Sequence, residues 1–77
     1  MAKYFPSERT MAQIGRCFTY HTPKGDQDTR YEDLRESAQL LAIRIAELTP
    51  ESREQSLSFT HLEQAIMFAN AAIARNE

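Results

Sequence analysis

One short stretch of the sequence, residues 18–27 (FTYHTPKGDQ), combines aromatic, basic and turn-forming side chains. Tyr20 and His21 provide ring faces that can stack on nucleobases, and Lys24 provides an ammonium group. Gly25 allows a ligand to approach the main chain closely, and free N–H groups at a helix start attract phosphate. The stretch therefore predicts a site for a phosphorylated, base-bearing ligand. The alternative is an ordinary structured linker with its rings packed on the helices.

Positive charge gathers around this stretch although the whole chain is slightly acidic. The chain has 77 residues and a formal charge of −2. Residues 9–25 include three basic side chains and no acidic one, whereas five acids follow in residues 26–36. This asymmetry predicts a local positive patch for a small anion. The overall charge argues against the basic field with which proteins bind DNA or RNA non-specifically.

Residues that catalyse reactions or bind metals are sparse. His21 and His61 are far apart, Cys17 is the only cysteine, and neither an HExxH nor a paired CxxC motif occurs. Cys17 and His21 could form a thiol–imidazole pair, but no third group is available to orient the histidine. No glycine-rich phosphate loop is present. We therefore predict a protein that is not an enzyme and has no metal site and no cofactor.

Cysteine content and hydropathy indicate the compartment. A single cysteine cannot form an internal disulfide, which suits a reducing intracellular environment. The first ten residues (MAKYFPSERT) lack the apolar core of a secretory signal, and no run approaches the roughly 18 apolar residues of a membrane span. The sequence therefore predicts a soluble cytosolic protein that does not enter a membrane.

The elements that would position the candidate residues are helices. Ser7 is a good N-cap for a short helix that continues to about residue 16, with Gly15 expected to end it. A turn at residues 23–26 then leads into a second helix, whose N-cap is Asp26 or Asp28.

The second helix is expected to end at Thr49, because the residue before a proline is pushed out of helical geometry. A third helix follows at once, with Thr49 or Ser52 as its N-cap and Pro50 in its first turn. Since the connection is so short, the two long helices should form an antiparallel hairpin. The predicted fold is therefore a single all-α domain, residues 1–77, comprising an N-terminal helix in 1–17, a ligand-binding loop in 18–27 and a helical hairpin in 28–76.

Apolar side chains on the two long helices predict an assembly larger than one chain. The main stripe expected on the second helix is Tyr31, Leu34, Ala38, Leu41, Ile45 and Leu48. The main stripe expected on the third helix is Leu62, Ala65, Ile66, Ala69 and Ile73. Further apolar residues flank both stripes, and the short first helix is too small to cover them. We therefore predict a homo-oligomer in which hairpins pair or form a ring.

Several separated motifs occur together in the chain. They are FTYHTPKGDQ at residues 18–27, followed by Arg30 and Tyr31, then SREQSL at 52–57 and FANAAIARNE at 68–77. In this combination and order the chain resembles a family of phage proteins, the anti-CBASS cyclic-nucleotide sponges, where CBASS is the cyclic-oligonucleotide-based antiphage signalling system. The resemblance extends from residue 18 to the C-terminus, and residues 1–17 have no obvious counterpart.

The resemblance implies a function without catalysis. Members of the family are helical homo-oligomers that look like hexamers built from dimers. They bind cyclic dinucleotides such as cyclic GMP-AMP, and cyclic trinucleotides in a separate pocket, and keep these messengers from the bacterial effector. By this resemblance we expect the chain to block CBASS immunity in the cytoplasm of the infected bacterium. Its expected partners are these messengers and further copies of itself, likened to a hexamer, rather than DNA, RNA or a membrane.

Roles for individual residues also follow from the resemblance. The phosphodiester groups would be bound by Lys24, together with Arg16 or Arg9. The bases would stack on Tyr20, with Tyr4 and His21 as further candidates. Backbone N–H groups and a base-recognising carboxylate near the helix start would come from Gly25 and Asp26. The cations available for a second pocket are Arg30, Arg53 and Arg75.

Two other functions are compatible with parts of the sequence. A helical oligomer that binds other proteins through its apolar faces, with no nucleotide ligand, agrees equally well with the helical periodicity. A nucleic-acid-binding hairpin is disfavoured by the net negative charge and by the lack of a basic stripe. The first alternative predicts an oligomer that is indifferent to nucleotides, and the second predicts strongly salt-dependent affinity for DNA or RNA.

Overall fold

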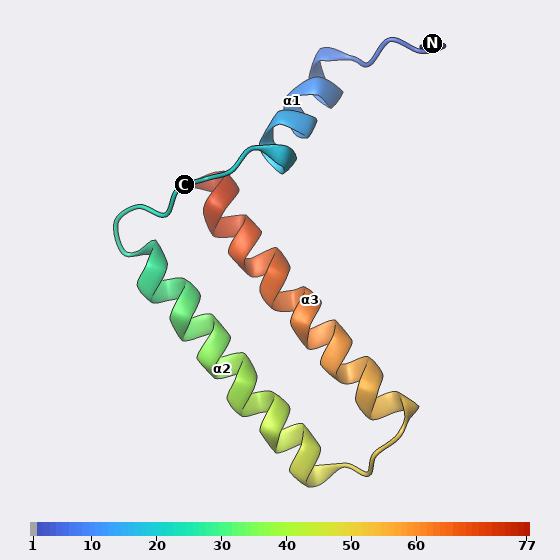
Figure 1. Ribbon diagram of the computed structural model, residues 1–77, viewed down its shortest axis with the longest axis vertical. Coiled ribbons are helices and arrows are strands. Elements are labelled where there is room, and N and C mark those ends of the chain that lie inside the picture. The colour runs from blue at the N-terminus through green and yellow to red at the C-terminus, as the bar shows by residue number, and fades with distance from the viewer. Residues whose placement is uncertain (1) are drawn as a thin grey trace.

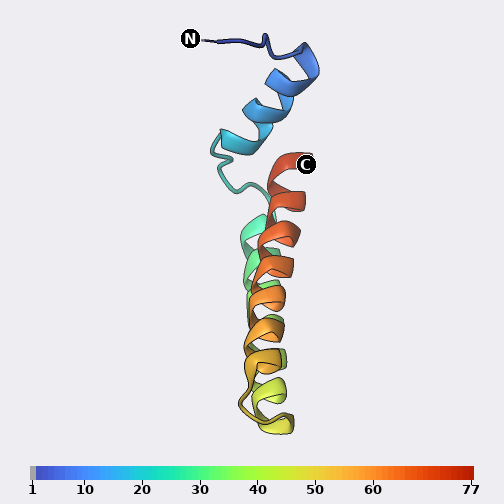
Figure 2. The same ribbon diagram turned by 90° about the vertical axis from the view of Figure 1, so that its right-hand side faces the viewer.

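The structure, a computed structural model, describes residues 2–77 and contains no strand in that part of the chain. Its three helices are α1 (Glu8–Phe18), α2 (Gln27–Leu48) and α3 (Arg53–Asn76). The last two form an antiparallel hairpin, and α1 projects from its open end, close to the C-terminus (Figure 1). Viewed from the side, the hairpin is a single thin layer (Figure 2). The prediction of an all-α chain with a short first helix and a long hairpin is confirmed.

Serine side chains begin two of the helices, as predicted. The Ser7 hydroxyl accepts a hydrogen bond of 3.1 Å from the Thr10 N–H at the start of α1. The Ser52 hydroxyl accepts one of 3.1 Å from the Gln55 N–H at the start of α3. These side chains satisfy N–H groups that have no partner within the helix. Of the two alternatives for α3, Ser52 is therefore the N-cap.

Thr49 ends α2, as predicted, but the expectation that Pro50 lies in the first turn of α3 is wrong. The Thr49 N–H and hydroxyl both donate to the Ile45 carbonyl, at 3.0 and 2.6 Å. The Gln55 side chain reaches back and donates to the Thr49 carbonyl at 3.2 Å. The connection is therefore held by side-chain hydrogen bonds before α3 begins at Arg53, and Pro50 stays in it.

Gly15 lies inside α1, so the prediction that it ends this helix is wrong. The helix continues to Phe18 and stops at Thr19, which is extended with φ −99° and ψ 132°. A glycine in a helix costs only about 1 kcal/mol relative to alanine, so the helix can pass through it. Nothing lies within 4 Å of where a Cβ at this position would be, so packing does not require a glycine here.

The turn before α2 occupies residues 24–27, one residue later than predicted. Its hydrogen bond runs from the Gln27 N–H to the Lys24 carbonyl at 3.1 Å. Gly25 has a φ of +60°, a conformation that residues with a side chain adopt at a cost. Asp26 occupies the N-cap position, as predicted, but its carboxylate makes no cap hydrogen bond. The backbone turn, rather than that side chain, defines the start of α2.

The two long helices pack through small and medium-sized side chains. Ala42, rather than the predicted Leu41, is half-buried in the hairpin interface. Phe59, one of the apolar residues expected to flank the stripe of the third helix, is also half-buried. Leu41 and Leu48, both predicted for the stripe, are 50% and 68% exposed. Ala65 is also exposed. The interface therefore uses alanine at a position where the sequence favoured leucine, which leaves larger apolar groups outside.

Residues 2–77 of a single chain form no hydrophobic core. Among residues 2–77 no apolar side chain is buried, and Gln27, at 4% exposure, is the one buried polar residue. The accessible surface is 6764 Å², against about 4,800 Å² expected for a compact protein of this mass. The radius of gyration is 17.3 Å, against about 11.5 Å for a compact chain of this length. Stable folding therefore calls for burial of this surface against something outside the chain.

The helices also differ from membrane-spanning helices in their hydropathy. Within residues 2–77, no helix is both long enough and apolar enough to cross a bilayer.

Candidate functional site

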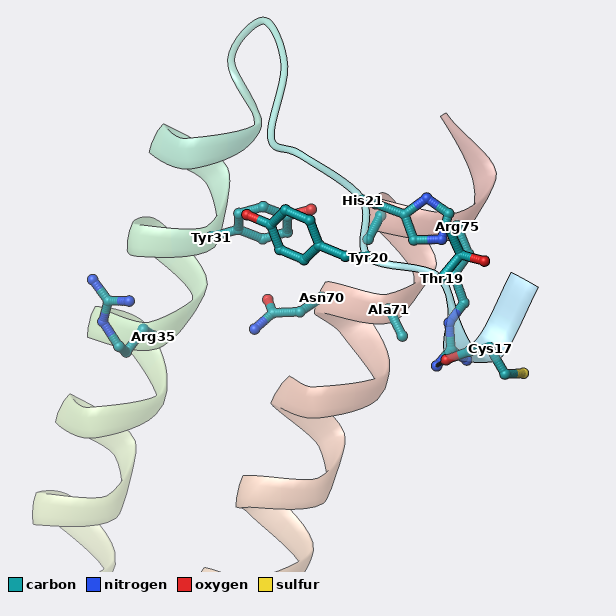
Figure 3. Close-up of a pocket in the computed structure, with 10 residues that line it drawn as sticks. Cys17, Thr19, Tyr20, His21, Tyr31, Arg35, Asn70, Ala71 and Arg75 are labelled. Carbon is teal, nitrogen blue, oxygen red and sulfur yellow. Dashed lines mark hydrogen bonds between the residues drawn. The ribbon is translucent and has the colours of Figure 1, made fainter. Parts of the chain in front are cut away.

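An open hollow lies at the open end of the hairpin, where three segments far apart in the sequence meet (Figure 3). The end of α1 with the loop after it, the first turns of α2 and the last turns of α3 each contribute to it. Its volume of about 460 Å³ is within the usual range for ligand pockets, roughly 300 to 1,000 Å³. The lining residues are Cys17, Thr19, Tyr20, His21, Tyr31, Arg35, Asn70, Ala71, Ala74 and Arg75.

Side chains of the loop and of α3 hold the end of α1 over this hollow. Nε2 of His21 lies 3.2 Å from the Arg16 carbonyl, to which it donates when that nitrogen is protonated. Arg75 donates to the Cys17 carbonyl at 3.4 Å, and Arg16 donates to the Asn76 side chain at 3.0 Å. The last carbonyls of a helix have no partner within the helix and carry partial negative charge. These bonds therefore fix the direction in which α1 leaves the hairpin.

The hollow offers ring faces and cations together. Tyr20 is 81% exposed and Tyr31 is half-buried. The positively charged groups of the lining are the guanidinium groups of Arg35 and Arg75. Among residues 2–77, the ion pairs are made by Arg30 and Arg44, so neither lining arginine is neutralised by a carboxylate. The arrangement can therefore stack planar bases and bind anions at the same place.

A second polar cluster lies beside the hollow and ties the end of α3 to the turn before α2; we name it the C-terminal latch, and its residues are Gln27, Arg30 and Glu77. The Glu77 carboxylate accepts from Nη1 of Arg30 at 2.8 Å and also from Nη2. It accepts a third bond, of 3.3 Å, from the Gln27 side chain. Gln27 in turn accepts from the Lys24 N–H at 3.1 Å. The latch therefore holds the turn that presents Lys24.

We expect the latch to make stability depend on pH below about pH 4.5. Hydrogen bonds from Arg30, and then from Gln27, lower the pKa of Glu77 from 4.5 to about 2. The Arg30 pKa is raised by the same pair, so this side chain stays charged. A carboxyl whose pKa falls on folding stabilises the fold above its unfolded pKa, and this contribution is lost as pH falls through its folded pKa.

The measurement is the melting temperature of the full chain and of Glu77→Gln between pH 6 and pH 2. The advantage of the parent should be constant above about pH 5 and should shrink towards pH 2. Other carboxyl groups titrate in both proteins, so the difference between the two curves isolates Glu77. A constant difference across the range would show that the latch does not contribute in this way.

Of the residues predicted for the site, the structure brings three into the hollow. Tyr20 and His21 come from the loop, and Arg75 comes from α3, more than 50 residues later in the sequence. His21 also bonds to the end of α1, a role that the sequence did not indicate. Lys24, Gly25 and Asp26 lie in the adjoining turn but do not line the hollow of the single chain. Their predicted roles in ligand binding therefore stay proposals.

The other predicted residues lie elsewhere in the chain. Arg30 is bound by the carboxylates of Glu77 and Asp26, so it is not a free cation in this structure. Arg9 and Arg16 line a separate hollow on α1. Tyr4 is 78% exposed in the segment before α1. Arg53 begins α3, at the opposite end of the hairpin from the hollow. In the single chain these residues therefore lie away from the hollow.

Tyr31, Arg35 and Asn70 line the hollow but were not among the sequence-based candidates. Tyr31 and Arg35 are four residues apart on α2, which places them on one helical face. Asn70 lies within the FANAAIARNE motif, whose likeness to the phage family gave it no role. The signal for the first pair was helical spacing, but Tyr31 was assigned to the apolar stripe of the second helix, and nothing in its local sequence distinguishes Arg35 from a solvent-facing arginine. Residues 2–77 contain no group of three His, Cys, Asp or Glu side chains that could hold a metal ion.

Most of the chain matches a known protein family. The family described as Acb2/Tad1, hairpin domain, matches residues 12–74, which is most of the chain. The match begins six residues before the stretch in which the resemblance was recognised from sequence motifs, and it includes the end of α1. Searches of curated proteins and of solved structures found no significant match. The chain therefore belongs to the Acb2/Tad1 hairpin-domain family, the anti-CBASS cyclic-nucleotide sponges.

Proposed function

We propose that the chain sequesters cyclic oligonucleotide second messengers without altering them, and so blocks CBASS immunity. The observation that supports this most directly is the hollow at the open end of the hairpin. It joins two tyrosine rings to two arginines that have no carboxylate partner in the described chain. A cyclic oligonucleotide consists of bases and phosphodiester groups, which are the partners of these two kinds of side chain. Membership of the sponge family supports the same ligand class.

Each part of the ligand has a proposed partner. Tyr20 is the main stacking surface, because its ring is exposed and lies at the hollow. Arg35 and Arg75 bind phosphodiester groups, and Lys24 in the adjoining turn adds a third cation. Charge-assisted hydrogen bonds of this kind contribute about 1.5 to 3 kcal/mol each. Gly25 and Asp26 keep their proposed role at the start of α2, where N–H groups and a carboxylate meet the ligand.

Assembly is part of the proposal. The chain exposes roughly 2,000 Å² more surface than a compact protein of its mass. We propose a homo-oligomer, specifically a hexamer built from dimers, that buries this surface. A cyclic dinucleotide has approximate two-fold symmetry and a cyclic trinucleotide approximate three-fold symmetry, so each fits a site on a matching axis. In such an assembly, Arg9, Arg16 or Tyr4 of one copy can join the hollow of another, and Arg53 can serve a second pocket.

The proposed setting is the cytoplasm of the infected bacterium, where these messengers are made. The proposed ligands are cyclic dinucleotides such as cyclic GMP-AMP, and cyclic trinucleotides. Nucleic-acid polymers are not among them, because the formal charge of −2 offers no extended basic surface.

A capture-and-release assay tests the proposal. The purified chain is mixed with cyclic GMP-AMP or cyclic tri-AMP, and the free ligand is separated by filtration. The bound fraction is then released by heat denaturation and analysed by chromatography. We expect depletion of the free ligand followed by recovery of the intact molecule. Recovery of linear or smaller products would identify a phosphodiesterase instead, and no depletion by any cyclic nucleotide would refute sequestration.

One observation favours a second candidate, a helical oligomer that binds another protein. An apolar groove of about 420 Å³ lies between α2 and α3, and its apolar lining is Ala38, Ala42, Phe59, Leu62, Ile66 and Met67. Such a groove can accept a helix from a partner. This candidate predicts an oligomer that does not deplete any nucleotide, so the capture assay separates the two functions.

A further inference from the structure

We infer that Asn70 is the residue that recognises the base, and that the base it selects is adenine; this inference rests on the proposed function and deepens it. Asn70 lies on α3, at the wall of the hollow that Tyr20 and Tyr31 also line (Figure 3). Its side-chain oxygen is buried, and no donor in the described chain bonds to it. It is thus an acceptor without a partner beside two ring faces.

This state is unusual for a buried polar atom. The large majority of such atoms in folded proteins have a hydrogen-bond partner, and each exception calls for an explanation. The other asparagine of the chain shows the normal case on the same helix. The Asn76 oxygen accepts from Arg16 at 3.0 Å, and its amide nitrogen donates to the Ala72 carbonyl at 2.9 Å. The unpaired oxygen of Asn70 is therefore a property of its position in the hollow.

The chemistry of the amide limits what can complete it. The oxygen needs a donor, so a phosphate group, which offers acceptors at neutral pH, cannot be its partner. Adenine presents the N6 amino group as a donor next to N7 as an acceptor, and an asparagine amide pairs with both atoms. Along the same edge guanine presents two acceptors, O6 and N7, which suit an arginine instead, and its donors, N1–H and the 2-amino group, lie on its other, Watson–Crick edge. Asn70, which lines the hollow beside two ring faces, thus suits adenine held edge-on to the amide through N6 and N7.

The arginines of the hollow complement this assignment. Arg35 and Arg75 also line it, and no carboxylate forms an ion pair with either of them in residues 2–77. Guanidinium groups bind phosphodiester oxygens in a bidentate manner. The hollow then holds the three functions that adenine-bearing cyclic oligonucleotides require, which are ring stacking, phosphate binding and recognition of the base edge.

The test compares two ligands that differ only at the group in question. One is cyclic di-AMP, and the other is its analogue in which hydrogen replaces both 6-amino groups. Affinities of the full chain are measured by calorimetry for the parent, Asn70→Ala, Asn70→Asp and Gln64→Ala. Gln64 is the matched control, because it is an exposed amide on the same helix and does not line the hollow.

The parent and Gln64→Ala should prefer cyclic di-AMP over the analogue by roughly 5- to 150-fold, the range for one good amide–base pair. Asn70→Ala should bind both ligands equally. Asn70→Asp keeps the acceptor oxygens and the side-chain shape, so it should retain the preference even if its charge weakens binding of both ligands. Because the readout is a ratio of affinities, a general loss of folding or assembly does not imitate the expected result.

Two failures can be told apart. If the parent binds no cyclic nucleotide, the proposed function fails and this inference fails with it. If the parent binds cyclic di-AMP but does not distinguish it from the analogue, or if Asn70→Ala keeps the preference, the inference alone is overturned. A selective loss of cyclic di-GMP binding by Asn70→Ala, with cyclic di-AMP binding unchanged, would likewise overturn the assignment to adenine.

Discussion

The substitution Phe68→Asp is expected to convert the proposed homo-oligomer into single chains and to abolish the proposed binding of cyclic nucleotides. Phe68 is 74% exposed on α3, so it contributes little to the packing of its own hairpin. Its neighbours around a second hollow, which adjoins the ligand hollow and shares Ala71 and Arg75 with it, include Met67, which is 62% exposed. Two adjacent apolar side chains of this size on the surface of a helix indicate an interface.

The size of the effect follows from the symmetry. Burying a phenylalanine stabilises an interface by about 1.5 to 3 kcal/mol, and a two-fold interface contains the residue twice. Its loss should therefore weaken association roughly 100- to 10,000-fold, since each 1.4 kcal/mol is a factor of ten. An aspartate adds the cost of removing a charge from water.

Light scattering coupled to size-exclusion chromatography measures the mass of the assembly, and the capture assay measures binding. Phe68→Leu, which stays apolar, should keep both the mass and the binding. Thr60→Asp is the matched charge control, because Thr60 is exposed on α3 and its hydroxyl bonds only to the Ser56 carbonyl of its own helix. A Phe68→Asp protein with the parent's mass and the parent's affinity would show that this face is not the interface.

The second large effect is expected from Tyr20→Ala, which removes the proposed stacking surface. Tyr20 lines the hollow and is 81% exposed, so the ring is available to a ligand and contributes little to packing within the chain. Stacking of a base on an aromatic side chain contributes about 1 to 3 kcal/mol. Affinity for cyclic GMP-AMP should therefore fall by roughly 5- to 150-fold for each base that stacks.

Two further variants make this result specific. Tyr20→Phe keeps the ring and should bind about as tightly as the parent. Tyr4→Ala removes a tyrosine of similar exposure that does not line the hollow of its own chain. If Tyr4→Ala weakens binding as much as Tyr20→Ala does, then the segment before α1 of a neighbouring copy brings Tyr4 to the ligand. Unchanged affinity in Tyr20→Ala would exclude this ring from the site.

Local features of the fold could be predicted from the sequence because they depend on neighbours along the chain. Ser7 and Ser52 begin their helices through bonds to residues three positions later. Helical periodicity and the short connection at residues 49–52 likewise indicated the hairpin. Two boundaries were predicted wrongly. At Gly15, α1 continues because His21 and Arg75 bond to carbonyls beyond it. At Pro50, the Ser52 cap makes α3 begin only at Arg53.

The candidate site was predictable only in part, since it depends on which helical turns lie opposite each other. The motif at residues 18–27 identified Tyr20 and His21, both of which line the hollow. It could not indicate that the latch would bind Arg30 to Glu77, because those residues are 47 positions apart. The closing of the hairpin neutralises that predicted cation and leaves Arg35 and Arg75 as the cations of the hollow.

The sequence by itself determined the three helices, the serine caps of α1 and α3, the aromatic and basic loop and the excess of apolar surface. Each of these follows from interactions over a few residues or from composition alone. Only the tertiary structure decided that Asn70 and Arg75 stand beside Tyr20, and that Ala42 rather than Leu41 is half-buried in the hairpin interface. The physical reason is that the register of two packed helices depends on side-chain packing along their whole length, which no single motif encodes.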